Sequence, residues 1–303
     1  MPTVRTVLRG ARTYRYLVQS YRWQGKLRKK ELYLGKSVPK DLSRFSADLD
    51  RAIRSETWYA LLDEIQAAYR RYRVAQPQSV REKETGSFVL EFTYDTNRIE
   101  GSTLSLEDTR SLLERELLPA AKPLRDVRET QNHARLLRRL LRSPEPLDLR
   151  HLLGWHRELF QDTKPDLAGR LRDYEVRIRG SRHLPPSGIE VRPSLLELLR
   201  WVSRSATGIH PVERAAEFHY RFEHIHPFGD GNGRVGRLAM NLLLAQKDFP
   251  MLNIQYTGRR GYYSALERSS LSNDSRAFLH WFLLRYTRAN EPYLKLASQP
   301  RRR

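Results

Sequence analysis

The sequence predicts an all-α protein with small β appendages. After Asp41, apolar residues recur at three- and four-residue steps through most of the chain, which is the spacing of amphipathic helices. Only two short segments, 13–34 and 175–191, carry alternation typical of strands. We therefore expect a helical core that bears a small N-terminal β-hairpin and a short internal β-hairpin.

The composition is that of a globular and strongly basic chain. Of its 303 residues, 39% are hydrophobic, and 55 Lys and Arg residues against 35 Asp and Glu give a net charge of +20. Such a charge attracts nucleic acid, nucleotides or acidic proteins, although a solvated arginine-rich surface is the simpler interpretation. Because the chain contains no cysteine, disulfides, thiolate catalysis and cysteine-ligated zinc are excluded.

Four regions are expected along the chain. They are a basic N-terminal β-hairpin region (1–45), a helical region (46–104), a core (105–290) and a basic tail (291–303). Disorder is expected from Leu296 to Arg303. No apolar run approaches the roughly 18 residues of a membrane span, and the first residues lack the apolar core of a signal peptide. We expect a soluble, cytoplasmic protein without a membrane partner.

A β-hairpin, or part of a small sheet, is expected over 13–34, with its turn at Gln24-Gly25-Lys26. Its basic residues are interleaved with four aromatic ones, Tyr14, Tyr16, Tyr21 and Trp23. Such a surface could stack on and neutralise nucleic acid, so a nucleic-acid-binding regulator is the alternative function. The simpler interpretation is that these basic residues only line the edge of the hairpin and bind no specific ligand.

Helices separated by turn-forming residues follow the hairpin. The first is expected to end near Val74, before Gln76-Pro77. Further helices are expected at 79–98, 105–118, 125–142, 147–162, 195–204, 211–225, 232–247, 260–271 and 275–289. The internal hairpin is expected to leave along Glu175–Arg179, turn at Gly180-Ser181 and return near Ile189–Val191.

The stretch from His226 to Arg237, HPFGDGNGRVGR, predicts a site for a polyphosphate. Glycines at 229, 231 and 233 let the backbone approach a ligand closely, and the apolar residues that follow have helical spacing. The loop therefore leads into a helix N-terminus, where unpaired N–H groups favour phosphate. Arg234 and Arg237 lie three residues apart and suit two phosphate groups.

The same stretch contains the parts of a nucleotidyl transfer. The ring of His226 can accept a proton from a hydroxyl nucleophile. Asp230 is a hard oxygen ligand of the kind that Mg2+ uses, with phosphates completing its coordination. The backbone N–H groups of Gly231, Asn232 and Gly233 can cradle phosphate. A Walker-type G-x-x-x-x-G-K-[ST] motif is absent from the sequence.

This stretch resembles the signature of the Fic family, H-x-F-x-[DE]-G-N-G-R-x-x-R, and meets every specified position. The resemblance covers about residues 90–290 and implies a Fic-type helical core. It also implies a Mg2+-dependent transfer of AMP from ATP to a Ser, Thr or Tyr hydroxyl of a protein, with release of pyrophosphate.

The resemblance implies roles for individual residues. His226 would be the general base and Asp230 the Mg2+ ligand, and the phosphates would be held by Gly231, Asn232, Gly233, Arg234 and Arg237. Tyr262 and Tyr263 would line the adenine pocket, although Ser270 stands where asparagine is frequent. A related branch that transfers phosphate has lysine in place of Gly233 and lacks the second arginine, so this chain fits adenylyl transfer.

The internal hairpin resembles the family's flap, which aligns a target segment by strand-like pairing. The residues expected to dock the target are Arg179, Gly180, Ser181, Arg182 and His183. Self-modification, a homodimer and nucleic acid bound through the basic surface are further partner hypotheses.

The string Thr96-x-x-x-Glu100-Gly101 resembles the inhibitory [ST]-x-x-x-E-[GN] motif of one class of Fic proteins. A carboxylate paired with Arg237 would occupy the place of a γ-phosphate and repel ATP. The resemblance thus implies that Glu100 holds the enzyme off. Two alternatives stay open: Glu100 could orient a water that removes AMP from a target, or it could be an ordinary helix-terminal residue before a capping glycine.

Overall fold

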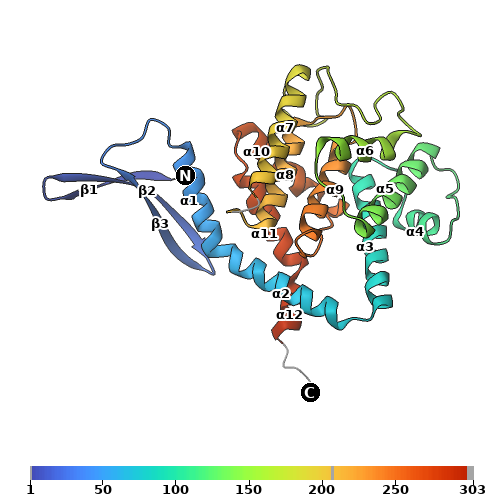
Figure 1. Cartoon of the computed structure of the whole chain (residues 1–303), viewed down its shortest axis with the longest axis horizontal. Coiled ribbons are helices and arrows are strands. Elements are labelled where there is room, and N and C mark those ends of the chain that lie inside the picture. The colour runs from blue at the N-terminus through green and yellow to red at the C-terminus, as the bar shows by residue number, and fades with distance from the viewer. Residues whose placement is uncertain (1, 206–207, 299–303) are drawn as a thin grey trace. The chain divides into compact units, whose positions relative to one another are not determined.

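The structure is a computed structural model that describes residues 2–205 and 208–298. It divides into two compact units, Met1–Glu64 and Ile65–Arg303, and the boundary falls inside the helix α2. The first unit contains a sheet and a helix, and the second is helical (Figure 1). The predicted class, mostly helical with a small β appendage, is therefore confirmed.

Unit 1 contains a three-stranded antiparallel sheet in the order β1-β2-β3. Its strands are β1 (Thr3–Arg9), β2 (Arg12–Trp23) and β3 (Lys26–Gly35). The predicted hairpin is β2–β3, and its turn residues Gln24 and Gly25 have positive φ. The prediction missed β1. This strand buries none of its residues. It therefore lacks the alternation of apolar and polar residues that marks a strand packed on a core.

One face of the sheet packs on α1 (Ser43–Arg54). Leu17 and Leu34 of the sheet and Leu49 and Ile53 of the helix form this small core. The helix continues through a π-helical turn, Ser55–Tyr59, into α2 (Ala60–Ala75). The long helix predicted to end near Val74 is therefore present.

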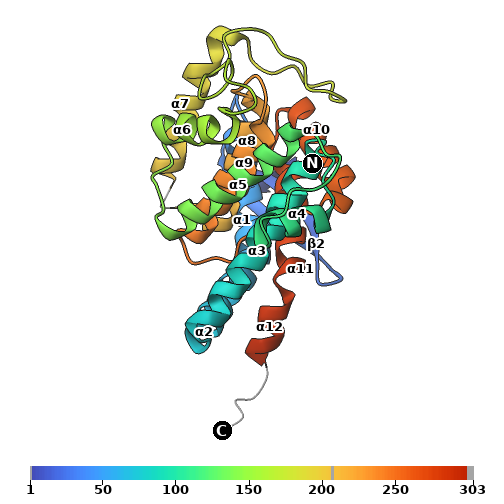
Figure 2. The ribbon, with the colours of Figure 1, turned by 90° about the vertical axis from the view of Figure 1, so that its right-hand side faces the viewer.

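The remaining helices lie in unit 2. They are α3 (Gln78–Ile99), α4 (Leu106–Glu114), α5 (Leu124–Arg142), α6 (Leu149–Phe160), α7 (Gly188–Arg204), α8 (Pro211–Ile225), α9 (Asn232–Ala245), α10 (Arg259–Ser272), α11 (Arg276–Ala289) and α12 (Glu291–Ser298). The paired helices α8 and α9 form the centre, with α3, α5 and α6 against α9 and with α7, α10 and α11 against α8 (Figures 1 and 2). This arrangement buries α9 on nearly every side: its residues from Asn232 to Leu244 are all buried.

The internal hairpin was predicted wrongly, because the described residues between 169 and 187 form no strand. The expected return segment is instead the first turn of α7, which begins seven residues earlier than predicted. Ser187 and Glu190 form a capping box that starts this helix, and Pro193 inside it obscured the helical pattern.

The chain end also differs from the prediction. The disorder expected from Leu296 onward is contradicted as far as Ser298, because residues 291–298 form α12. Tyr293 packs its ring against Tyr69 and Tyr72 of α2, with ring centroids 5.1 and 5.6 Å apart, and this aromatic contact stabilises the helix. Residues 299–303, which include the three final arginines, lie outside the described residues. Within the described part of the chain, no helix is long and apolar enough to cross a membrane.

Candidate active site

The predicted phosphate loop joins the two central helices. His226 ends α8 in the left-handed conformation, with φ of 51°, and Gly231 precedes α9 with φ of 80°. Asn232 closes the loop, because its side chain accepts from the backbone N–H of Phe228 at 2.8 Å and donates to the Phe228 carbonyl at 2.9 Å. The loop backbone therefore leads directly into the N-terminus of α9, the end of a helix that favours anions.

Two residues missed by the sequence analysis hold this loop from outside. Arg172 donates to the carbonyl oxygens of His226 at 2.7 Å and Ile225 at 3.1 Å. The ring of His156 bridges the Asp230 carbonyl and the Gly169 N–H, both at 2.9 Å. Burial lowers the pKa of His156 to about 4, so the ring is neutral, with its proton on the nitrogen that faces the carbonyl.

The ring of His226 is neutral at physiological pH. Burial is the main cause, and it lowers the pKa of His226 to about 4, against an opposing effect of the Glu100 carboxylate. A neutral imidazole can accept a proton, so the residue is ready to act as a base without first losing one.

Arg237 is buried, with 1% of its side chain exposed, and its shortest hydrogen bonds reach the end of α3. Its guanidinium donates to the Glu100 carboxylate at 2.6 Å, to the Thr96 hydroxyl at 2.8 Å and to the Thr96 carbonyl at 3.2 Å. Thr96 and Glu100 lie one helical turn apart, so both elements of the string T-x-x-x-E bind the same arginine.

Gly233 makes room for this contact. A Cβ at position 233 would collide with the Glu100 carboxylate and the Arg237 guanidinium. Glu100 therefore lies against the first turn of α9, where the helix dipole favours a negative charge. The carboxylate occupies the place where the sequence analysis expects a phosphate.

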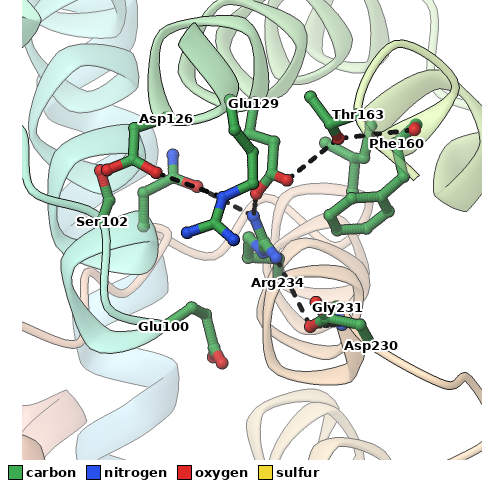
Figure 3. Close-up of polar contacts among 12 residues, drawn as sticks. Glu100, Ser102, Asp126, Glu129, Phe160, Thr163, Asp230, Gly231 and Arg234 are labelled. Atoms are coloured by element: carbon green, nitrogen blue, oxygen red, sulfur yellow. Dashed lines mark hydrogen bonds and ion pairs between the residues drawn. The ribbon is translucent and has the colours of Figure 1, made fainter. Parts of the chain in front are cut away.

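Arg234 belongs to a second cluster of charges, and Figure 3 shows it between Glu129 and Asp230. It pairs with the buried carboxylate of Glu129 on α5, which also accepts from Lys164 at 2.7 Å. Lys164 reaches the Asp230 carboxylate at 3.0 Å, and Arg234 lies 3.7 Å from it. The ring of Phe160 lies under both cations, 4.4 Å from the Arg234 guanidinium carbon and 4.8 Å from the Lys164 nitrogen.

Asp230 and Arg234 are predicted from the signature, whereas Glu129 and Lys164 join them only in the folded structure. A signal existed for Glu129, because it follows Asp126 on the apolar face of a predicted helix, beside Val127 and Thr130. A carboxylate on a buried face needs a cationic partner.

The Asp230 carboxylate is suited to hold Mg2+. Burial opposes its ionisation, but the charges of Arg234 and Lys164 keep the pKa of Asp230 below its usual value, and 43% of its side chain is exposed. Nowhere in 2–205 or 208–298 do three His, Asp or Glu side chains gather into a metal-binding group. A single ionised carboxylate fits an ion that takes its other ligands from phosphates and water.

The two tyrosines predicted to line the adenine pocket have different environments. Tyr263 is 45% exposed and donates to the Ile99 carbonyl at 3.1 Å. Tyr262 is buried below Arg237, and its hydroxyl lies 2.8 Å from the His219 ring. Of this pair, only Tyr263 presents its ring at the surface.

The flap is anchored through side chains. Glu267 of α10 accepts from the Ser181 hydroxyl and from the Arg182 N–H, the latter at 2.8 Å. His183 is buried and stacks on His224 with ring centroids 4.2 Å apart, while Arg179 and Gly180 are exposed. The expected docking residues thus form a tethered loop whose tip is accessible.

Known proteins resemble both the sequence and the fold. The Fic/DOC family model matches residues 146–244, which include the phosphate loop. Protein adenylyltransferase fic-1 of Caenorhabditis elegans is 33% identical over 196 residues, 63% of this chain and 38% of that protein. Protein adenylyltransferase Fic of Nematostella vectensis is 31% identical over 206 residues, 66% of this chain and 48% of that protein. The chain thus spans less than half the length of these relatives.

A solved fragment of Fic-1 from Caenorhabditis elegans superposes with a TM-score of 0.69 at 28% identity. The match covers 84% of this chain and 76% of that fragment, so it takes in most of the helices as well as the loop. Together with the family match, this places the signature residues on the fold that the signature implies. The chain therefore carries a Fic/DOC family domain.

Proposed function

We propose that the protein is a Mg2+-dependent protein adenylyltransferase held in a resting state by Glu100. Its substrates are ATP and a protein hydroxyl. The observation that carries the proposal is the set of groups around the N-terminus of α9: a neutral His226, an ionised Asp230 and two buried arginines. The names of the relatives support the reaction type.

In the proposed reaction, the target hydroxyl oxygen attacks the α-phosphorus of ATP, and the bond to pyrophosphate breaks. His226 accepts the hydroxyl proton. The N–H groups at the start of α9 and the guanidinium of Arg237 stabilise the charge on the leaving pyrophosphate. Bound Mg2+, held by Asp230, would supply further charge stabilisation to the phosphates. The exposed tip of the flap positions the target segment.

The proposed resting state depends on the contact between Arg237 and Glu100. Because Glu100 pairs with this arginine at 2.6 Å, ATP can gain the contact only by displacing the carboxylate. The γ-phosphate and the carboxylate are both anions and both match the guanidinium fork. We propose that the active state begins when Glu100 leaves.

Labelling with ATP that carries a radioactive α-phosphate tests the proposal in a cell extract with Mg2+. Glu100→Gly should label proteins strongly, wild type weakly, and Glu100→Gly with His226→Ala not at all. Label on the chain itself would report self-modification. Glu116→Gly is the matched control: Glu116 is an exposed loop residue whose φ of 57° suits glycine. Equal labelling by all variants would refute the assigned roles.

Removal of AMP is the alternative reaction at the same site. It is favoured by the position of Glu100, whose charge acts on His226 and which can orient a water there. A target adenylylated by Glu100→Gly and then repurified distinguishes the two. If wild type releases AMP from it and Glu100→Gly does not, removal is an activity of this protein.

A further inference from the structure

The two faces of the sheet in unit 1 differ in chemistry. Leu17 and Leu32, paired across β2 and β3, belong to the face that packs on α1. Successive residues of a strand point to opposite faces. Tyr14 and Tyr16 of β2 therefore lie on the other face, together with Tyr33, which pairs with Tyr16.

The three tyrosine rings form a cluster on this second face. The ring centroids of Tyr16 and Tyr33 are 5.4 Å apart, and those of Tyr14 and Tyr33 are 6.2 Å apart. Tyr33 is 49% exposed, and the other two are half-buried. The cluster thus leaves aromatic surface available on which the base of a nucleotide can stack.

Arginines of β1 border the rings. The guanidinium carbon of Arg5 lies 5.8 Å from the Tyr16 ring centroid, and that of Arg9 lies 6.0 Å from the Tyr14 centroid. Arg9 also lies directly opposite Arg12 of β2. Like charges in this position repel each other and destabilise the sheet, and a bound polyanion would offset the repulsion.

The charge balance around the face is strongly positive. Eleven of the first 40 residues are Lys or Arg, and Glu31 is the one acidic residue among them. Glu31 already pairs with Arg5 at 2.5 Å and with Lys29 at 3.1 Å. The other cations beside the rings are therefore available to phosphate groups.

We propose that this surface binds single-stranded nucleic acid. We call it the tyrosine face and define it by Arg5, Arg9, Arg12, Tyr14, Tyr16 and Tyr33. Arginines would contact successive phosphates while bases stack on the rings, the combination used by sequence-tolerant single-strand binders. A duplex keeps its bases stacked on one another, so the rings would contribute little to binding it. An acidic protein segment would pair with the arginines, but its carboxylates would not stack on the tyrosine rings.

Fluorescence anisotropy of labelled oligonucleotides of about 16 residues with the full-length chain tests this proposal. DNA and RNA strands of one sequence show which sugar is preferred, and a duplex of the same sequence is the comparison. The single strand should bind tighter than the duplex. Tyr16→Ala with Tyr33→Ala should weaken single-strand binding by about tenfold or more, because each stacked base contributes roughly 1–3 kcal/mol.

Matched variants separate stacking from charge. Tyr16→Phe with Tyr33→Phe keeps the rings and should keep the affinity. Arg9→Ala with Arg12→Ala should reduce the slope of log affinity against log salt by roughly 1.4, whereas Arg200→Ala with Arg204→Ala, at exposed positions of α7, should leave the slope unchanged. Circular dichroism verifies that each variant is folded.

Three outcomes would overturn the proposal: no binding near 0.1 M salt, equal binding of single strand and duplex, or equal losses from the α7 and tyrosine-face variants. Because adenylyl transfer is measured separately on His226 variants, failure here leaves the proposed enzyme activity untouched.

Discussion

Glu100 and Arg237 are 137 residues apart in the chain, yet the Arg237 guanidinium donates to the Glu100 carboxylate at 2.6 Å. The arginine is buried, and the glutamate side chain is 26% exposed. A buried cation needs an anionic partner in every state of the protein. Arg237 is therefore expected to exchange one anion for another, and the glutamate is the partner that can move into solvent.

The pH dependence of transfer follows from His226. Only the neutral ring accepts a proton, and burial lowers the pKa of His226 to about 4. As the pH falls, activity should therefore persist well below 6.5, the ordinary pKa of histidine. It should be lost at or below about pH 4, because Glu100→Gly also removes the carboxylate that raises the pKa of His226. A rate profile of Glu100→Gly from pH 8 to pH 4, with circular dichroism at each pH, measures this. An acid limb centred near 6.5 would contradict the assigned environment.

Glu129 should matter for stability, because its buried carboxylate pairs with the buried Arg234. Glu129→Gln removes the buried charge partner of Arg234 and leaves only the half-exposed Asp230 carboxylate at 3.7 Å, so the free energy of unfolding should fall by roughly 3–5 kcal/mol. The control is Glu107→Gln, whose 60%-exposed side chain pairs with Arg110 at 3.0 Å and should change it by at most about 1 kcal/mol. Urea unfolding at pH 7 compares the two, and equal small losses would contradict the structure.

The Glu129 carboxylate should also make the stability of the protein depend on pH. Burial opposes its ionisation, but Arg234 and Lys164 hold the pKa of Glu129 below its usual value. Its contribution is present above the unfolded pKa of about 4.3 and is lost as the pH falls through the lower folded value. Between pH 6 and pH 3, wild type should therefore lose more stability than Glu129→Gln.

Lys164 should compete with Mg2+ for Asp230, because its ammonium group lies 3.0 Å from that carboxylate. Lys164→Met, in a Glu100→Gly background, should lower the Mg2+ concentration for half-maximal labelling roughly fivefold, equivalent to about 1 kcal/mol. Lys122→Met, which removes a lysine 3.2 Å from Asp108, is the control. A higher Mg2+ requirement would show instead that Lys164 assists metal or phosphate binding.

The sequence predicted features that depend on local chemistry. Apolar spacing and helix breakers predict the helices from α1 to α11, except for the first seven residues of α7. The glycines of the phosphate loop and the apolar helix after them predict the turn into α9. The contact between Glu100 and Arg237 was anticipated through the family resemblance, since nothing in the sequence itself relates positions so far apart.

Features that depend on tertiary partners were missed. Arg172 looks like any surface arginine until the fold brings four backbone carbonyls around it. Residues 175–179 alternate like a strand, but their neighbours bind to Glu267 and Arg172 instead of to a paired strand. Side-chain anchors of this kind leave no periodic signal, because one residue at one position suffices.

The exchange of partners at Arg237 is tested most directly by nucleotide affinity. Isothermal titration of ATP and of AMP, with Mg2+, into His226→Ala and into His226→Ala with Glu100→Gly avoids turnover. Loss of the carboxylate should tighten ATP binding about tenfold or more, because a hydrogen bond to a charged group contributes roughly 1.5–3 kcal/mol. AMP, which has no γ-phosphate, should change by less than about twofold on the same reasoning. Unchanged ATP affinity, or an equal gain for AMP, would contradict the account.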